Sequence, residues 1–193
     1  KGQTAVVVRS GIGKVNAGIC TQILADEFQV EAVINTGIAG SLKAEINIGD
    51  IVLSTDTMQH DVDAREFGYP LGQIPRMETL TFLADEKLRK LAKEVCEEVN
   101  PDIQVFEGRV ASGDQFVADK ETKEKIIENT QAYCTEMEGA AIGQAAYLNK
   151  IPYLVIRAIS DKADDSAHVD YPTFERQAIR HTVNLVSSMM ERL

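Results

Sequence analysis

Blocks of apolar residues alternate along the chain with segments in which apolar positions recur at helical spacing. Six short apolar runs, rich in β-branched residues, predict strands at residues 4–9, 32–36, 50–55, 104–111, 132–135 and 153–161. The segments between them predict helices at residues 15–28, 85–99, 120–128, 139–148 and 172–193. Strands that alternate with helices are typical of an α/β fold, so we expect a twisted mixed central sheet, largely parallel and flanked by helices.

The length of the chain favours one domain over residues 1–193. A chain of 193 residues is long enough to bury most of the surface that its unfolded form exposes. The long stretch without a periodic pattern, residues 58–76, is polar and contains glycine, proline and aromatic residues. Loops of this length are uncommon in compact domains unless they have a function, so we expect this one to serve function or contact a partner.

The charge balance excludes several classes of partner. The formal net charge of −10 opposes binding to nucleic acids and anionic membranes, because each phosphate contact needs lysine or arginine. No apolar run approaches the roughly 20 residues that cross a bilayer, and residues 1–8 are too short for a signal peptide. We therefore expect a soluble, cytoplasmic protein.

The cysteines indicate neither disulfides nor a metal site. Cys20, Cys96 and Cys134 lie far apart, without a Cys-x-x-Cys pair or a histidine at metal-ligand spacing. We interpret them as small hydrophobic residues. The sequence therefore predicts no metal and no cofactor.

The strand predicted at residues 153–161 contains three polar residues towards its end, Arg157, Ser160 and Asp161. Ligands of open α/β sheets bind beyond the carboxyl ends of the strands, where these side chains would lie. A carboxylic acid can donate a proton there at neutral pH if burial or a neighbouring acid raises its pKa. Asp161 would otherwise be a helix N-cap or an ion-pair partner.

A second acidic pair, Glu136 and Glu138, flanks Met137 at another junction of strand and helix. On an extended backbone both glutamates share a face, whereas on a helix they diverge, so we expect one of them to face the ligand. A carboxylate is a natural acceptor for the vicinal hydroxyls of a ribose. In the alternative interpretation, both stabilise the N-terminus of the next helix through its dipole.

Three glycine-containing segments follow predicted strands. Residues 10–14 (SGIGK) lack the spacing of a P-loop or of a dinucleotide fingerprint, so we interpret them as a tight turn. Residues 36–40 (TGIAG) would either expose backbone N–H groups to a ligand or allow tight packing. Residues 112–117 add Phe116, whose ring would stack on a planar base or lie in the core.

These segments occur together in one family. Those that carry the resemblance are residues 10–15, 35–40, 49–52, 67–69, 72–75, 112–114, 136–138 and 157–161. They resemble, in order and over essentially the whole chain, bacterial 5'-methylthioadenosine/S-adenosylhomocysteine nucleosidases of the nucleoside phosphorylase superfamily. The Glu-Met-Glu and Ser-Asp motifs are shared with purine nucleoside phosphorylases, whereas residues 67–69 (FGY) and 72–75 (GQIP) favour the nucleosidases.

The resemblance implies an enzyme that hydrolyses the N-ribosidic bond through an oxocarbenium-like transition state, releasing adenine and a 5-thioribose product. Asp161 would protonate or hydrogen-bond adenine N7, and Ser160 would help to place it. Arg157 would help to position the attacking water near the backbone of Ile38 and Ala39.

The same resemblance implies a set of substrate-binding residues. Glu138 would hold the ribose hydroxyls, with Met137 beneath the sugar and Glu136 in the same motif. Phe116 would stack on adenine, while the backbone of Val117 reads its Watson–Crick edge.

The 5'-thio substituent would lie in an apolar region that includes Tyr171. The resemblance implies a homodimer in which the segment of residues 67–75 reaches the neighbouring site. Phe67, Ile74 and Pro75 would then complete the apolar region from the second copy.

One feature of the family lies outside the sequence. Family members begin with a further strand and a Met-Glu-Glu-Glu-type segment whose glutamate activates water, and this chain starts downstream of it. We therefore expect the chain by itself to lack the water-activating glutamate. Two other functions stay open: a purine nucleoside phosphorylase, which would require phosphate, and a non-catalytic adenosine-binding module.

Overall fold

The structure, a computed structural model, describes residues 4–164 and 167–193, without the side chains of residues 168–173, 177 and 178. Its helices are α1 (Lys14–Phe28), α2 (Glu86–Val99), α3 (Lys120–Thr130), α4 (Gly139–Asn149) and α5 (Ala167–Met190). Its strands are β1 (Val33–Ser41), β2 (Ile51–Gln59), β3 (Phe82–Leu83), β4 (Val105–Ser112), β5 (Cys134–Glu136) and β6 (Tyr153–Asp161). A short 3-10 helix, η1 (Arg65–Phe67), lies in the long loop after β2. The predicted alternation of strands and helices is confirmed.

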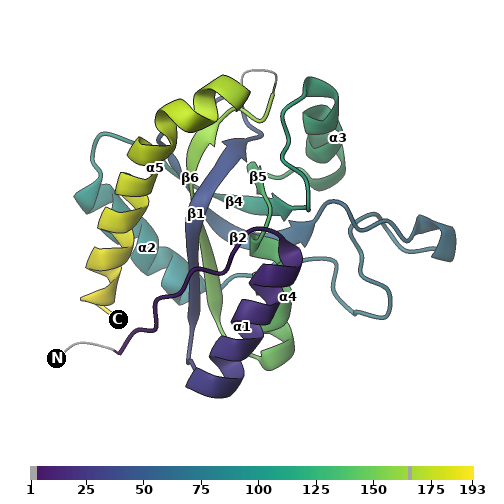
Figure 1. The fold of residues 1–193 in the computed structure, drawn as a ribbon, viewed down its shortest axis with the longest axis horizontal. Coiled ribbons are helices and arrows are strands. Elements are labelled where there is room, and N and C mark those ends of the chain that lie inside the picture. Colours follow the sequence, from purple (N-terminus) through teal and green to yellow (C-terminus); the bar gives the residue numbers. More distant parts are fainter. Residues whose placement is uncertain (1–3, 165–166) are drawn as a thin grey trace.

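The sheet closes on itself, which the sequence analysis did not predict. The strand order is β3-β2-β4-β5-β1-β6, and β2 also pairs with β6. A register shift between Ser54 and Thr57 divides β2, so that its first residues pair with β6 and its later ones with β3. Half of the strand pairs are antiparallel. The expected mixed sheet flanked by helices is confirmed, but it is barrel-like and only half of its strand pairs are parallel (Figure 1).

The strand predicted at residues 4–9 is absent. This segment has no regular secondary structure, and Val7 is 92% exposed. Apolar β-branched residues favour an extended backbone, but a strand forms only where a neighbouring strand exchanges hydrogen bonds with it. The described sheet provides no such neighbour for this segment.

Strand β1 continues beyond its predicted end at Thr36. It passes through the glycine-containing segment to Ser41, because β6 runs parallel to it as far as the pairing of Gly40 with Asp161. A Cβ atom on Gly40 would lie 2.7 Å from Asp161 Oδ1 and 2.7 Å from the Ala163 Cβ. Only glycine allows this approach at position 40, so Gly40 serves tight packing at the end of β6.

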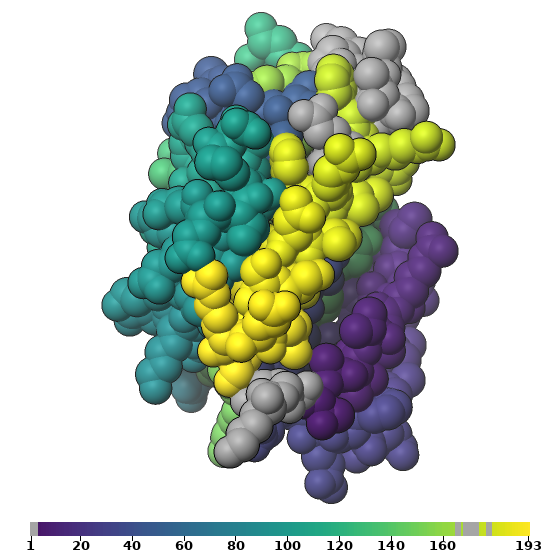
Figure 2. Space-filling view, turned by 90° about the vertical axis from the view of Figure 1, so that its left-hand side faces the viewer, coloured from purple at the N-terminus to yellow at the C-terminus, as the bar shows by residue number. Residues whose placement is uncertain are grey.

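The helices cover the sheet on two sides (Figure 1). Helices α2 and α5 pack against each other and against the sheet, while α1 packs on α4. Figure 2 shows α5 crossing one face of the molecule, between α2 and the N-terminal segment. Helix α5 begins at Ala167, ahead of the predicted start at Pro172.

The core lies between the sheet and these helices. Its fully buried side chains come mainly from β2 and β6, with Ile51, Leu53, Leu154 and Ile156 fully inaccessible to solvent. Within the described ranges, no helix combines the length and the apolar character needed to cross a membrane.

Candidate active site

A cavity of about 650 Å³ opens at the carboxyl ends of β1, β5 and β6 and beside the loop after β4. Ligand crevices of α/β proteins commonly occupy this position. The lining includes ten of the side chains that the sequence predicted for the site: Ile38, Ala39, Phe116, Val117, Glu136, Met137, Glu138, Arg157, Ser160 and Asp161. The fold therefore brings together residues that are up to 123 positions apart in the sequence.

The residues predicted for the 5' region are placed elsewhere. Phe67, Ile74 and Pro75 lie on the loop after β2, which projects to the right in Figure 1, and none of the three lines the cavity. Phe67 is 83% exposed, whereas Ile74 packs partly against the core. The side chain of Tyr171 lies outside the described part of the structure.

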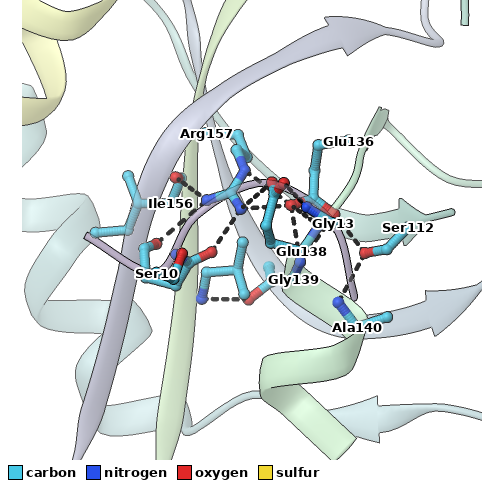
Figure 3. Close-up of polar contacts among 12 residues, drawn as sticks. Ser10, Gly13, Ser112, Glu136, Glu138, Gly139, Ala140, Ile156 and Arg157 are labelled. Carbon is cyan, nitrogen blue, oxygen red and sulfur yellow. Dashed lines mark hydrogen bonds and ion pairs between the residues drawn. The ribbon is translucent and has the colours of Figure 1, made fainter. Parts of the chain in front are cut away.

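The carboxylate of Glu136 points into the protein and is held there by several donors (Figure 3). Its Oε1 accepts from the Ser112 hydroxyl and from Gly139 N (3.0 Å). Its Oε2 accepts from Glu138 N (3.1 Å), from Gly139 N (2.8 Å) and from the Arg157 guanidinium. Glu136 thus satisfies backbone N–H groups at the N-terminus of α4, which have no partner inside the helix.

Arg157 is 1% exposed and uses its guanidinium within the protein. Its Nε and Nη2 donate to Glu136, and Nη2 also donates to Asn35 Oδ1. Its Nη1 donates to the backbone oxygens of Ile156 (3.0 Å) and Asn35 (3.4 Å). These bonds account for all five N–H groups of an arginine. The predicted contact of Arg157 with water would require one of these bonds to open.

Asp161 is buried at the end of β6, with 2% of its surface exposed. Its Oδ2 accepts from the Ser160 hydroxyl (2.8 Å), and its Oδ1 accepts from Ala163 N (2.8 Å). The carboxyl group is therefore held in one orientation at the wall of the cavity, with Ser160 beside it as predicted.

Both glutamates line the cavity, but Glu138 is the more accessible of the two, with its side chain 19% exposed against 3% for Glu136. Glu138 Oε1 accepts from Gly13 N (2.9 Å), while Oε2 lies 4.0 Å from Arg157 Nη2. Burial and the neighbouring charge of Glu136 raise the pKa of Glu138 above its usual range. This carboxylate is thus less stabilised in the folded protein than in the unfolded chain, as expected for a group that serves a ligand.

We expect Glu138→Gln to stabilise the fold at neutral pH while weakening binding of a ribose. A raised pKa in the folded state means that stability falls as pH rises through the titration of Glu138, and glutamine removes this loss. Urea unfolding at pH 7 should show a higher midpoint for the variant, and the difference should vanish below about pH 4, where glutamate is protonated in both states. Glu128→Gln, at an exposed position of α3, is the control. An equal gain from both changes would contradict the assignment.

Apolar groups line the remaining part of the cavity. Phe116 is 46% exposed at its wall, next to the buried Val117, and Met137 and Ile38 are partly buried. An aromatic ring at an open wall can cover the face of a planar base. The cavity thus combines an apolar surface with carboxyl groups from two different strand ends.

Several lining residues were not predicted for the site. Asn35 accepts from Arg157, and Arg9, Ser10 and Ile12 also line the cavity. Ser112 lies behind the lining, where its hydroxyl donates to Glu136. The polar Asn35 inside an apolar strand was the one signal in the sequence that pointed to such a role. Among the described residues, no group of three or more His, Cys, Asp or Glu side chains is placed to hold a metal ion.

Comparisons with known proteins agree on one superfamily. The model of the phosphorylase superfamily matches residues 1–191. The 5'-methylthioadenosine/S-adenosylhomocysteine nucleosidase of Bacillus subtilis is 40% identical over 194 aligned positions, which cover 100% of this chain and 83% of that relative. The nucleosidase of the same name from Treponema pallidum is 39% identical over 210 positions, covering 97% of this chain and 78% of the relative.

Solved structures show the same similarity. The 5'-methylthioadenosine/S-adenosylhomocysteine nucleosidase of Neisseria meningitidis, solved with methylthio-immucillin-A, has a TM-score of 0.91 and 37% identity, covering 95% of this chain and 79% of that one. Futalosine hydrolase of Helicobacter pylori has a TM-score of 0.90 and 37% identity, with 95% and 78% covered. The matches extend over the strand ends that form the cavity, and by them the chain belongs to the phosphorylase superfamily and, within it, to the family of 5'-methylthioadenosine/S-adenosylhomocysteine nucleosidases.

Proposed function

We propose that this protein is an N-ribosidic hydrolase that cleaves 5'-methylthioadenosine and S-adenosylhomocysteine, releasing adenine. The observation that carries the proposal is the buried Asp161 carboxyl group at the wall of a cavity that also contains Glu138. The names of the relatives and the inhibitor held by the Neisseria enzyme support the same substrates. The reaction needs a proton for the leaving base and negative charge near the developing cation on the sugar.

Asp161 protonates or hydrogen-bonds N7 of adenine in the proposed mechanism. Its bonds from Ser160 and Ala163 N hold the carboxyl group in place before the substrate binds. Protonation lets adenine leave as a neutral base, which lowers the barrier to breaking the N-ribosidic bond. Phe116 covers the face of the base, and the backbone of Val117 contacts its edge.

Glu138 accepts hydrogen bonds from the ribose hydroxyls, and Met137 lies beneath the sugar. The carboxylate also stabilises the positive charge that develops on the sugar in the transition state. Glu136 acts through the protein, because its oxygens already accept from Ser112, backbone N–H groups and Arg157. We therefore assign substrate contact to Glu138 and a supporting role to Glu136.

Water, rather than phosphate, is the proposed nucleophile. Arg9 and Arg157 are the basic residues that line the cavity within the described ranges. All five N–H groups of Arg157 donate to protein acceptors, so this guanidinium would have to give up one of these bonds to bind a phosphate. The proposed activator of this water is a glutamate of the kind that the family resemblance implies.

Adenine release from 5'-methylthioadenosine, measured with and without phosphate, tests the proposal. The chain and a form extended by the N-terminal segment that the resemblance implies serve as paired samples. We expect release that does not depend on phosphate, at a higher rate in the extended form. Release that requires phosphate would make the protein a phosphorylase, and tight binding without release in both forms would make it a binding module.

We also propose that the protein acts in the cytoplasm as a homodimer, in which the 67–75 segment reaches the partner's cavity. Phe67 supports this assignment, because an 83% exposed aromatic ring on a projecting loop suits contact with a second copy. Phe67 does not line the cavity of its own chain, so we assign its contact to the cavity of the second copy.

Phe67→Ser is expected to raise KM for 5'-methylthioadenosine about tenfold, the scale of one lost apolar contact in a pocket, with little change in stability. Steady-state adenine release and thermal unfolding provide the two measurements. Leu83→Ser is the matched control, because Leu83 is 77% exposed and lies outside the cavity. An unchanged KM in the Phe67 variant would remove this segment from the site.

A further inference from the structure

Lys14 ends the SGIGK segment, and its side chain points away from the cavity. Its Nζ donates to Asp61 Oδ1 (2.6 Å) and to Gln59 Oε1 (3.0 Å), and Lys14 does not line the cavity. The segment therefore does not use its lysine as a phosphate loop does. We propose that Lys14 is a positioning residue for Glu138, an inference that rests on the proposed function.

Lys14 belongs to a closed ring of hydrogen bonds that joins three segments of the chain. Asp61 accepts from Lys14 Nζ through Oδ1 and from Asp114 N through Oδ2 (2.9 Å). Asp114 Oδ1 in turn accepts from the backbone N–H of Lys14 (2.8 Å). The ring thus ties the start of α1 to the segment after β2 and to the loop after β4.

The start of α1 has no capping side chain of its own. Gly13 is the N-cap residue, with φ at 91° and no side-chain hydrogen bond. The first N–H groups of a helix have no intrahelical acceptor and need partners from elsewhere. Here Glu138 Oε1 accepts from Gly13 N and Asp114 Oδ1 accepts from Lys14 N. Two carboxylates that are distant in the sequence cap the same helix.

The ring and Glu138 are connected through one residue, Gly13. Gly13 N–H, which holds Glu138, is next in the chain to Lys14, whose N–H and Nζ both belong to the ring. A Cβ on Gly13 would lie 3.0 Å from Asp114 Oδ1, and the φ of 91° also favours glycine, so glycine is what lets this N–H lie between the two carboxylates. The ring therefore fixes the donor that orients Glu138, and leaves Oε2 for the ribose hydroxyls.

Lys14 and its ring partner are only partly exposed. The side chains of Lys14 and Asp61 are 18% and 29% exposed, so their ion pair is less screened than one on the open surface. Opening the ring frees residues 10–13, which include the cavity wall at Ser10 and Ile12. Glu138 then loses its fixed donor while it retains the unfavourable proximity of Glu136.

The test is the affinity of the Lys14→Met protein for a carbon-linked analogue of 5'-methylthioadenosine, which cannot be hydrolysed, and for the 2',3'-dideoxy form of that analogue, both measured by calorimetry. Glu138 contacts only the hydroxyls that the dideoxy compound lacks. The dissociation constant of the dideoxy compound divided by that of the hydroxylated one therefore reports on the position of Glu138. We expect Lys14→Met to reduce this ratio about tenfold, the scale of a hydrogen bond to a charged group. A general loss of structure would lower the affinity for both ligands equally and leave the ratio unchanged.

A double-mutant cycle shows whether Lys14 acts through Glu138. Because both changes remove the same interaction, Lys14→Met combined with Glu138→Gln should reduce the ratio no further than Glu138→Gln alone. Asp61→Ala opens the ring without altering α1 and should reproduce the effect, and Lys14→Arg should restore part of the ratio. Arg65→Met is the control, since Arg65 pairs with Asp63 and is 64% exposed.

Each outcome decides between the proposals. A ratio in the Lys14 and Asp61 variants equal to that of the unaltered protein overturns this inference and leaves the proposed function standing. Additive losses in the double variant, or an equal loss in the Arg65 control, also overturn it. An unaltered protein that binds neither nucleoside overturns the proposed function itself.

Discussion

Replacing Asp161 by asparagine is expected to lower the rate of adenine release by about 10²- to 10⁴-fold, the usual contribution of a positioned general acid. Asparagine keeps one oxygen, which can accept from Ala163 N as Asp161 Oδ1 does now, while its NH2 group can donate to the Ser160 hydroxyl in place of the present bond to Oδ2. It has no acidic proton for adenine N7. Binding of 5'-methylthioadenosine should therefore change little while turnover is lost.

Single-turnover measurements of adenine release over a range of protein concentrations separate these two effects, because the half-saturating concentration reports on binding and the maximal rate on chemistry. They are made on the form of the protein that releases adenine in the paired assay. Asp102→Asn, at an exposed position outside the cavity, controls for the loss of one carboxylate. Undiminished release by the Asp161 variant would remove this residue from the mechanism.

Replacing Glu136 by alanine is expected to destabilise the fold by about 3–5 kcal/mol, because it leaves a buried guanidinium without its counter-charge. The side chains of Arg157 and Glu136 are 2% and 3% exposed in their ion pair. The change also removes the acceptor of two backbone N–H groups at the start of α4 and of the Ser112 hydroxyl. The rate of adenine release should also fall, because the backbone N–H of Glu138 donates to Glu136 and loses this acceptor.

Urea unfolding monitored by circular dichroism measures this loss. Glu107→Ala is the matched control, because Glu107 pairs with both Arg89 and Lys93 but is 29% exposed. Exposed ion pairs contribute about 0–1 kcal/mol, so the control should lie close to the unaltered protein. Equal destabilisation by the two changes would show that the buried pair has no special role.

The strand that carries Asp161 shows how much of the site could be predicted from local patterns. An uninterrupted apolar run predicted the strand at residues 153–161, and β6 has those bounds. The polar residues near its end indicated a ligand site, and the cavity contains Arg157, Ser160 and Asp161. The strand and the position of its polar end could be predicted because both are properties of a single segment, while the role of these residues toward a ligand stays a prediction.

The pair of glutamates shows what local sequence patterns cannot predict. Their spacing indicated that one of the two would face the ligand, but the choice depends on the backbone at the start of α4 and on Ser112 and Arg157 from other strands. The use of all Arg157 donors within the protein likewise depends on Asn35, more than 100 positions away. No periodicity within one segment contains this information.

The sequence by itself determined the order and type of most elements, the α/β class and the residues that gather at the strand ends, because each follows from short-range patterns of burial. Only the tertiary structure decided the closure of the sheet through β2 and β6, the missing strand at residues 4–9 and the ring that holds Lys14. These features depend on hydrogen-bond partners supplied by distant segments. A hydrogen-bond donor or an extended segment has a defined role only after folding has brought its partner next to it.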